Sequence, residues 1–485
     1  MKPGLLIIVG LAAIALALIS MLALDRLVDL VWMQVFLAVA FEVVILVCAL
    51  VIRPERALPF LCDPLVLFVT FHAQFFVVGP LAFPYTSAYA LTPVSSNAVV
   101  ATLLGFIGLL SMFLVGYHAP LGSLIARRLP SFDGRRAKFP GRWAEGGVLL
   151  VCLSVCGYYI TSYGGIRILL HRGYGSYETG AWFIAPFLLL VVATLLLAWR
   201  VFAAETRTWS VILLFAAVVG FEVLFWGFLL SQRKWLFYLF FGITGIFLLR
   251  RGTRAIPRFV LPTVLMILVV YLAFWGNVRA RPLAGLIAGR SDPRFAEIAS
   301  LQSGYLESVA GPFGAACLVL QIFPEREPFR YGQTLLVGLL SPIPRAIWPG
   351  KPIGLGKELT WYLGTYYAAS YDTTKGLSIT PTLVGDFYAN LGVAGILIGG
   401  LLLGLACRIV AAYAVHGMRD GLQFSPARVL VPSVFLAGLV ELRADIAMLI
   451  VFYMYTMIPL ALLLTFFSFE PEGGRYRELA SSRAH

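Results

Sequence analysis

The chain has 485 residues, of which 60% are hydrophobic and only 13% are charged. This composition excludes a water-soluble protein of that length, because soluble chains typically carry about a quarter charged residues. The net charge of +13 is typical of the Lys and Arg that gather in the cytoplasmic loops of membrane proteins. Since the sequence has no nucleic-acid-binding motif, we expect no nucleic acid partner.

Separate apolar runs of about 20 residues predict membrane-spanning helices. The expected fold class is an all-α polytopic integral membrane protein with about 12 transmembrane helices. The first run is too long for the apolar part of a signal peptide and lacks a convincing cleavage site, so we interpret it as a retained span. In chain order the runs lie near 4–24, 30–52, 59–83, 98–118, 144–162, 182–199, 208–230, 235–249, 259–276, 392–415, 429–441 and 446–468.

The predicted helices are interrupted once by a long segment. We expect helices 1–9 in residues 1–276, a segment with short amphipathic helices at 277–391, helices 10–12 in 392–468 and a tail at 469–485. Lys and Arg are concentrated in alternate connections between the spans. The positive-inside rule therefore places both termini in the cytoplasm and 277–391 on the extracytoplasmic side.

Three stretches of 277–391 carry structural signals. Phe295 to Val309 has the helical spacing of apolar residues that is typical of a helix lying in the membrane interface. Leu335 to Leu340 is apolar but too short to span, which favours a re-entrant or interfacial piece. Two further spans near 306–322 and 331–348 would preserve the orientation, so 14 spans are the alternative.

Several cations lie on the extracytoplasmic side, where the positive-inside rule expects few. Arg233 and Lys234 occupy a short outer turn, Arg279 and Arg281 follow the ninth span directly, and Arg443 lies between the last two runs with an acidic residue on either side. Charge near membrane depth costs about 2.5–3.5 kcal/mol per residue on insertion scales, so it usually has a partner or a function. Interfacial snorkelling or structural ion pairing is the alternative for each of them. As a set, they indicate a diphosphate site in the outer leaflet, because guanidinium groups match phosphate oxygens.

A proline-rich stretch, 341–352, contains Arg345, Trp348 and Lys351. Prolines prevent a regular helix there and stiffen the backbone, so these side chains would form a rigid surface for phosphate or sugar. A rigid interfacial turn with a Trp anchor is the alternative. Arg172, in an earlier outer loop, is a candidate substrate contact and equally an ordinary loop residue.

The stretch 378–392 places Asp386, Tyr388 and Asn390 where the chain re-enters the membrane. A partly desolvated carboxylate there is a candidate general base for a sugar hydroxyl, while a cap or salt bridge at the helix start is the alternative. The glycine pairs at 395/399 and 400/404 predict close helix packing. The acids inside other spans, Glu42, Asp63 and Glu222, are interpreted as interhelical hydrogen-bonding groups.

Motifs for bound metals and nucleotides are missing from the sequence. The outer segment has no His-x-x-x-His, no Asp-x-Asp and no carboxylate pair at ligand spacing, and the chain has no Walker or dinucleotide-binding motif. The cysteines lie mostly in or beside apolar runs, which does not indicate a structural disulfide. We expect no metal and no cofactor.

The whole chain resembles the Wzy-type O-antigen polymerases, also called oligosaccharide repeat unit polymerases. The resemblance rests on the many-span profile with one long outer loop late in the chain. It also rests on three local pieces: the basic turn Ser231–Trp235, the Pro-Arg-x-x-Trp-Pro-x-Lys-Pro segment at 344–352, and Gly385–Gly392 before a glycine-rich span.

The resemblance implies a multi-pass glycosyltransferase of the bacterial inner membrane, acting at its periplasmic face. Such enzymes move a growing glycan from one undecaprenyl diphosphate onto the repeat unit carried by another, with the lipid diphosphate as leaving group. The implied partners are undecaprenyl-diphosphate-linked oligosaccharide, the lipid bilayer, and a chain-length regulator and flippase of the same pathway. The implied product is O-antigen or a related surface polysaccharide, made without metal or soluble nucleotide sugar.

The candidate residues take roles within this implied reaction. Arg233, Arg279 and Arg281 would bind the donor diphosphate and stabilise its developing charge. Asp386 is the predicted base for the acceptor hydroxyl. The remaining contacts to the acceptor or the sugar would come from Arg172, Lys234, Arg345, Trp348, Lys351, Tyr388 and Arg443.

Two other functions remain open at this point. An O-antigen ligase has similar topology but transfers to a different acceptor, and a histidine in the large outer segment would favour it, whereas 277–391 contains none. A non-enzymatic lipid-linked oligosaccharide flippase or an ion-coupled transporter would show charge along a central path and repeat symmetry between halves. The distinctive polar motifs of this chain lie instead in its later outer segment.

Overall fold

The computed structural model describes residues 30–53, 57–85, 94–130, 139–162, 181–203, 209–229, 233–251, 301–343, 347–367, 380–419 and 425–468. Within these ranges the chain is helical apart from connecting turns and one short parallel pairing, β1 (Phe139–Pro140) with β2 (Phe467–Ser468). The all-helical class is therefore confirmed. The predicted spans at 4–24 and 259–276 and the tail lie outside the described residues.

The helices follow the predicted apolar runs in order. The first half of the chain forms α2 (Leu30–Val51), α3 (Pro64–His72), α4 (Val78–Ala82), α6 (Ser96–His118), α7 (Pro120–Arg128), α8 (Gly141–Ser162), α10 (Ala181–Ala203), α11 (Trp209–Glu222) and α12 (Arg233–Arg251). The second half forms α15 (Leu301–Ile322), α16 (Gln333–Leu339), α17 (Leu355–Tyr367), α18 (Thr382–Arg419), α19 (Pro426–Gly438) and α20 (Ile446–Phe466). A π-helical turn, Ala73–Val77, joins α3 to α4, and a 3-10 turn, Leu439–Arg443, follows α19.

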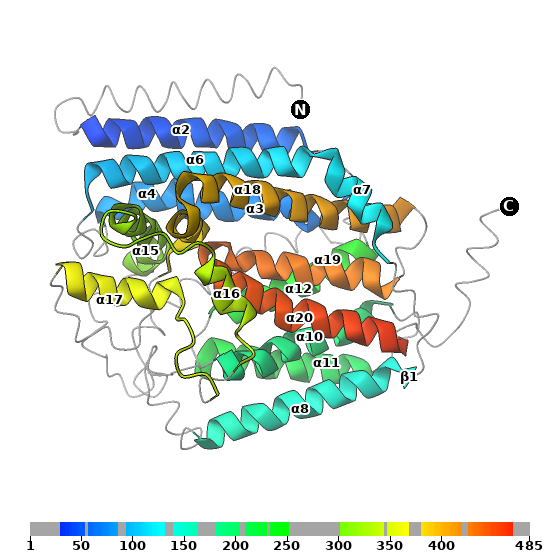
Figure 1. Ribbon diagram of the computed structural model, residues 1–485. Coiled ribbons are helices and arrows are strands. Elements are labelled where there is room, and N and C mark those ends of the chain that lie inside the picture. The colour runs from blue at the N-terminus through cyan, green and yellow to red at the C-terminus, as the bar shows by residue number, and fades with distance from the viewer. Residues whose placement is uncertain are drawn as a thin grey trace.

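The long helices lie side by side along a common direction, with α2 and α6 at one edge of the molecule and α8 at the opposite edge (Figure 1). Apolar side chains such as Leu104 and Leu150, each more than 60% exposed, cover the outside of this bundle. Such a surface suits lipid rather than water. Six described helical stretches are long and apolar enough to cross a bilayer: Pro64–Ala82, Ser96–His118, Ala185–Phe202, Trp209–Trp226, Thr382–His416 and Ile446–Phe466.

Helices α6 and α18 approach each other through glycines. A side chain at Gly404 would place its Cβ 2.0 Å from the carbonyl oxygen of Phe113, and one at Gly116 would lie 2.2 Å from that of Leu401. Only a residue without Cβ permits this approach, as in other membrane helix pairs. A Cβ at Gly400 would similarly lie 2.6 Å from a backbone oxygen of α6. The predicted packing role of the Gly400/Gly404 pair is therefore confirmed.

Helix α18 is broken near its start. Leu391 and Gly392 have non-helical backbone angles, and Gly392 has a φ of +61° that favours glycine. The short part before the break packs against the long part after it, since a Cβ at Gly399 would lie 2.4 Å from the Phe387 ring. The sequence predicted a span beginning at 392. The structure adds about two and a half helical turns, from Thr382 to Asn390, before that point and places the break between the two parts.

The long segment between α12 and α18 is more deeply packed than the sequence indicates. The second half of α15, Ala310–Ile322, is apolar and packs against α4, α6 and α18. Small residues make this possible, because a Cβ at Gly314 would lie 2.6 Å from the Phe83 ring. The predicted interfacial helix at 295–309 is described only from Leu301 onward, as the start of α15.

The alternative of a spanning helix at 331–348 is wrong. Helix α16 has seven residues and ends at Leu339, after which the chain turns at 340–343. A helix rises 1.5 Å per residue, so α16 is far too short for a bilayer. The short apolar piece predicted at 335–340 therefore belongs to a non-spanning helix. The twelve-span count and the outer location of this segment stay predictions.

Candidate functional site

Asp386 is fully buried in the short first part of α18. Its Oδ2 accepts a hydrogen bond from the backbone N–H of Ile446 at 2.7 Å, and its Oδ1 accepts one from Nδ2 of Asn390 at 3.0 Å. The hydroxyl of Thr334 also hydrogen bonds to this carboxyl group and accepts from Asn390 Nδ2 at 2.6 Å. Asp386 therefore ties the broken part of α18 to the N-terminus of α20 and to α16.

Asp445 lies directly before α20 and caps it. Its Oδ1 accepts a hydrogen bond from the backbone N–H of Met448 at 2.9 Å, and the carboxyl group also accepts from the backbone N–H of Gly356 in α17. Burial raises the pKa of Asp445 above its ordinary value; the Met448 hydrogen bond opposes this shift, the Glu441 carboxylate adds to it and the charge of Lys234 lowers it. Asp445 thus has a partly desolvated carboxyl group that faces charges from two other elements.

Lys234, at the start of α12, faces Glu441 in the 3-10 turn. Its Nζ lies 3.4 Å from Oε1 of Glu441, which is longer than the usual N–H···O range of about 2.7–3.2 Å. The Lys234 side chain is 23% exposed, whereas Glu441 is 3% exposed. The neighbouring Trp235 is buried and stacks on Trp226 at 4.3 Å between ring centroids, which fixes the start of α12. Lys234 is therefore positioned by its helix but only loosely paired.

These contacts converge where α12, the 3-10 turn, α16, α18 and α20 meet, and we call the converging side chains the helix-break site. Among its described residues, the Glu441 and Asp445 carboxyl groups interact with the Lys234 ammonium group, and the Asp386 carboxyl group interacts in turn with Asp445. The N-termini of α12 and α20 add partial positive charge at the same place. Within the described part of the chain, no group of three His, Cys, Asp or Glu side chains is arranged to hold a metal ion. The helix-break site consists of Lys234, Thr334, Asp386, Asn390, Glu441 and Asp445.

Several sequence-predicted residues lie in or beside the helix-break site. Asp386, Asn390 and Lys234 belong to it, and Arg233 is the first residue of α12. Tyr388 lies two residues after Asp386, with its ring 5.9 Å from that of Phe329.

Arg443 ends the 3-10 turn that carries Glu441. The alternative interpretation paired this arginine with its acidic neighbours. In the described structure Glu441 instead faces Lys234, and Asp445 caps α20.

The proline-rich stretch behaves partly as an internal support. Lys351 is buried, and its Nζ donates to the backbone carbonyl oxygens of Ser341 at 3.3 Å and Ile343 at 3.0 Å. This ammonium group therefore holds the loop together in the observed conformation. Trp348 is 40% exposed and remains accessible to a ligand. The predicted residues Arg172, Arg279, Arg281 and Arg345 lie outside the described residues.

The buried acids in other helices have partners across helix interfaces. Glu42 of α2 pairs with His72 of α3, and Glu222 of α11 accepts from the hydroxyl of Thr194 in α10 at 3.0 Å. Asp63 accepts from the Tyr117 hydroxyl at 2.6 Å and forms an ion pair of 3.3 Å with Arg53. The prediction that these acids make interhelical hydrogen bonds is confirmed.

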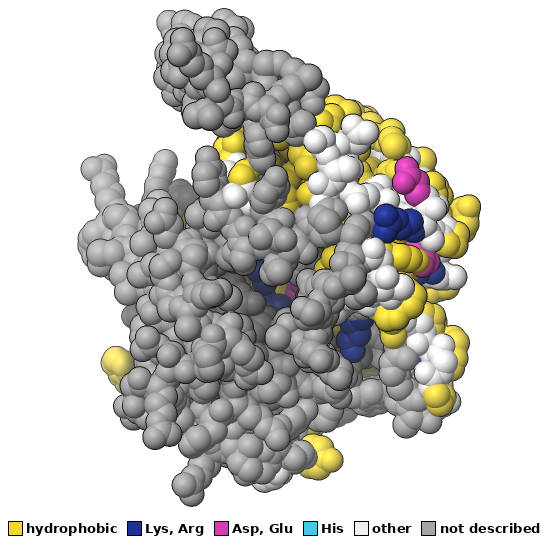
Figure 2. Space-filling model, turned by 90° about the vertical axis from the view of Figure 1, so that its left-hand side faces the viewer, with side chains coloured by type: hydrophobic (Ala, Val, Ile, Leu, Met, Phe, Trp, Pro, Cys, Tyr) yellow, Lys and Arg dark blue, Asp and Glu magenta, His cyan; other side chains and the backbone are white. Residues whose placement is uncertain are grey.

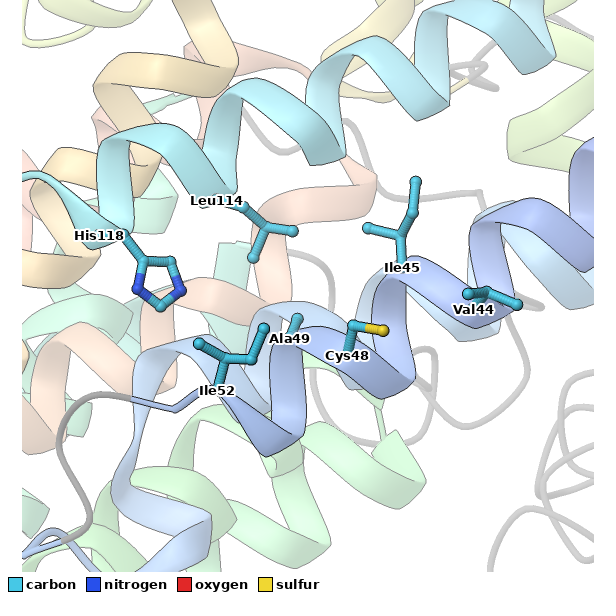
Figure 3. A pocket seen from close by; sticks show the side chains of 7 residues that line it. All are labelled: Val44, Ile45, Cys48, Ala49, Ile52, Leu114 and His118. Carbon is cyan, nitrogen blue, oxygen red and sulfur yellow. The ribbon is translucent and has the colours of Figure 1, made fainter. Parts of the chain in front are cut away.

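A pocket opens between the C-terminal halves of α2 and α6 (Figure 3). In the close-up, Cys48 and His118 lie apart and point in different directions, so they form no reactive pair. The remaining lining is apolar, which suits a hydrocarbon chain rather than a phosphate or a sugar. This pocket therefore adds nothing to the helix-break site. Its lining residues are Val44, Ile45, Cys48, Ala49, Ile52, Leu114 and His118.

Sequence reasoning missed Glu441, Asp445 and Thr334 as members of the site. The sequence presents the two acids only as neighbours of Arg443, and no pattern in it singles out Thr334. A usable signal existed for Asp445, because an Asp directly before an apolar run is typical of a helix N-cap. The pairing of Lys234 with Glu441 joins residues more than 200 positions apart, which a single sequence does not reveal.

Comparisons with known proteins give no further information on this site. No protein-family model, no curated protein and no solved structure matches the chain.

Proposed function

We propose that this protein polymerises undecaprenyl-diphosphate-linked oligosaccharide repeat units into O-antigen or a related surface polysaccharide, at the periplasmic face of the bacterial inner membrane. The observation that carries the proposal is the helix-break site, where the broken start of α18, the N-termini of α12 and α20, and the segment after α15 meet. A polar site at the ends of apolar helices suits the depth at which a lipid head group would lie.

Lys234 is the described cation best suited to a lipid diphosphate. It is partly exposed, and its contact with Glu441 is long enough to be exchanged for a stronger one. The two helix N-termini favour an anion at the same position. Together with Arg233, Arg279 and Arg281, which precede or follow neighbouring spans, Lys234 would stabilise the charge that develops on the leaving diphosphate.

The transfer needs a base for the acceptor hydroxyl. The acceptor oxygen bonds to the anomeric carbon of the donor sugar, the bond from that carbon to the lipid diphosphate breaks, and the hydroxyl proton passes to a carboxylate. Asp445 is the more accessible candidate, since it is partly exposed whereas Asp386 is fully buried, although it also accepts hydrogen bonds from the backbone N–H groups of Met448 and Gly356. Asp386, our prediction from the sequence, has each oxygen hydrogen bonded in the described conformation, so it would take the proton only after exchanging one of these partners.

The direct test is polymerisation by the purified protein in nanodiscs. The substrate is a lipid-diphosphate-linked repeat unit, supplied without metal or nucleotide, and the products are separated on a gel. The proposal predicts a ladder at multiples of the repeat unit. A single unchanged band from folded protein with its cognate substrate would contradict it, and transfer of one unit to a lipid A core acceptor would instead indicate a ligase.

One observation favours transport as a second candidate. The buried pair Glu42–His72 and the buried Glu222 lie inside the helices, where proton-coupled transporters carry titratable groups. A flippase would move the lipid-linked oligosaccharide between the leaflets of a proteoliposome without extending it. Movement of this lipid without a ladder would support transport over polymerisation.

A further inference from the structure

A second polar cluster lies on α17 and the turn that follows α15, outside the helix-break site. Arg330 is at its centre, with Nη2 located 3.1 Å from Oε2 of Glu358 and 3.6 Å from Oε2 of Glu327. The same nitrogen hydrogen bonds to the hydroxyl of Tyr362. Burial raises the pKa of Glu358, while the charge of Arg330 opposes this shift. The cluster is thus a fixed network that connects the turn to two successive positions on one face of α17.

Aromatic rings extend from this network to the surface. The indole of Trp361 is 59% exposed and lies 6.4 Å from the ring of Tyr366. The hydroxyl of Tyr366 donates to Oε1 of Glu327 at 2.6 Å, and the guanidinium of Arg326 lies 5.4 Å from its ring centroid. The Tyr366 ring is therefore held in place by Glu327, whereas the Trp361 indole, packed edge-on against Tyr362 and Tyr366, remains exposed to a ligand.

The turn that carries this network is hydrogen bonded to the broken part of α18. The backbone N–H groups of Arg330 and Tyr331 donate to the carbonyl oxygens of Ala389 and Asn390, at 2.8 and 3.1 Å. The N–H of Gly332 donates to Oδ1 of Asn390 at 2.8 Å, and Nδ2 of the Asn390 side chain donates in turn to Oδ1 of Asp386. Tyr331 is 76% exposed at this junction. The aromatic face is therefore directly connected to the helix-break site.

The charges on this face balance one another. Three acids, Glu325, Glu327 and Glu358, stand beside three bases, Arg326, Arg330 and Lys357. Arg330 is already engaged by two carboxylates, so the face offers no excess positive charge to a phosphate. The end of the molecule that carries α15 and α17 faces the viewer in Figure 2, where charged side chains alternate with apolar ones over its described part.

We propose that this face, formed by residues 325–331 and α17, is a binding surface for the sugar rings of the glycan. A pyranose has an apolar C–H face, which stacks on an aromatic ring, and a rim of hydroxyls, which hydrogen bonds to carboxylate and guanidinium groups. An electrically balanced face with exposed Trp and Tyr rings has this combination, whereas the helix-break site has the charged groups that suit the diphosphate. This inference rests on the proposed function, because it assigns the surface to the glycan part of the same substrate.

The surface thus holds the sugar rings that lie away from the reacting end. Its contact with Asn390 brings a bound glycan to the broken part of α18, so the reducing end can reach the helix-break site while the rest of the chain lies along α17. A chain held by several rings is extended more readily than one that leaves after each transfer. Loss of the surface therefore shortens the products before it abolishes transfer.

The test measures glycan binding without transfer. The probe is the water-soluble oligosaccharide released by mild acid from the lipid-diphosphate fraction of the cells that make this protein, and binding to the protein in nanodiscs is followed by calorimetry. Trp361→Ala is compared with Trp143→Ala, which removes another exposed indole, from α8. We expect a dissociation constant about tenfold higher for Trp361→Ala, the loss of one aromatic stacking contact, and no change for Trp143→Ala.

Three results of the binding and fluorescence measurements would overturn the inference. The first is no binding of the probe by the wild-type protein, and the second is equal dissociation constants for the two alanine variants. The third is a loss of the quenching of tryptophan fluorescence by brominated lipid when Trp361 is replaced by Phe, which would identify Trp361 as a membrane anchor. A failure of the glycan-binding surface can be distinguished from a failure of the proposed polymerase function. Trp361-dependent binding by a protein that makes no ladder would contradict polymerisation alone, while a ladder of unchanged length from Trp361→Ala would contradict the glycan surface alone.

Discussion

Removing the Asp386 carboxyl group should destabilise the protein, irrespective of any catalytic role. In Asp386→Ala the buried N–H of Ile446 loses its 2.7 Å acceptor, and the Thr334 hydroxyl loses its acceptor as well. The Asn390 amide loses less, because it still bonds to Thr334 Oγ1 and to the backbone oxygen of residue 386. A buried donor left unpaired costs about 1–3 kcal/mol. We therefore expect a loss of about 2–4 kcal/mol, the larger part of it from the Ile446 N–H.

Thermal unfolding in detergent measures this loss. Five of the six cysteines are buried and free, so a thiol-reactive dye reports their exposure as the protein unfolds. Asp386→Asn should unfold between the wild type and Asp386→Ala, because its amide oxygen can still accept from Ile446. The exposed Glu325→Ala removes a carboxyl group without burial and serves as the control. An Asp386→Ala protein as stable as this control would refute the account of Asp386 as the anchor of α20.

Two further predictions concern the same region and its support. Burial, and the Glu441 charge in addition, raise the folded-state pKa of Asp445, so its contribution to stability is present below the unfolded pKa of about 3.9 and is lost as the pH rises through the folded value. Asp445→Asn keeps the helix cap but carries no titrating carboxyl group. As the pH is raised from about 4 to neutral, the unfolding temperature of Asp445→Asn should therefore rise relative to that of the wild type. A difference in unfolding temperature that stays constant with pH would contradict this assignment. Gly404→Ala should lower the unfolding temperature because its Cβ would lie 2.0 Å from the Phe113 oxygen, whereas Gly157→Ala, with open space around it, should gain up to about 1 kcal/mol. Equal effects of the two alanines would show that the α6–α18 contact does not need its glycine.

The sequence predicts the helices well where hydropathy alone determines them. The ranges of α2, α6, α10 and α20 follow the predicted runs closely, because a span must be apolar along its whole length. Glycine spacing likewise predicted the close packing of Gly400 and Gly404. Both signals are local, so they can be read from one sequence.

The arrangement of the site depends on contacts that are not local. The break at Leu391 and Gly392 lies at the start of the predicted span 392–415, so the sequence did not show that a helix precedes it, and the left-handed glycine is one of many in that stretch. The sequence left the stretch around Ala310–Ile322 open between the outer segment and a further span at 306–322, because its small residues, which permit close packing, give a weak apolar signal. Lys234 and Glu441 are brought together only by the packing of α12 against the end of α19.

The central claim is that a lipid-linked glycan is transferred at the helix-break site, and the most direct test is the nanodisc polymerisation rate of Lys234→Met. The matched control is Arg128→Met, which removes an exposed cation from the end of α7. Removing one preorganised group that stabilises developing charge costs about 100-fold or more in rate. We predict a repeat-unit ladder from the wild type and from Arg128→Met, and a loss of that size from Lys234→Met protein whose unfolding temperature shows that it is folded. A Lys234→Met protein that builds the ladder at the wild-type rate would contradict the account.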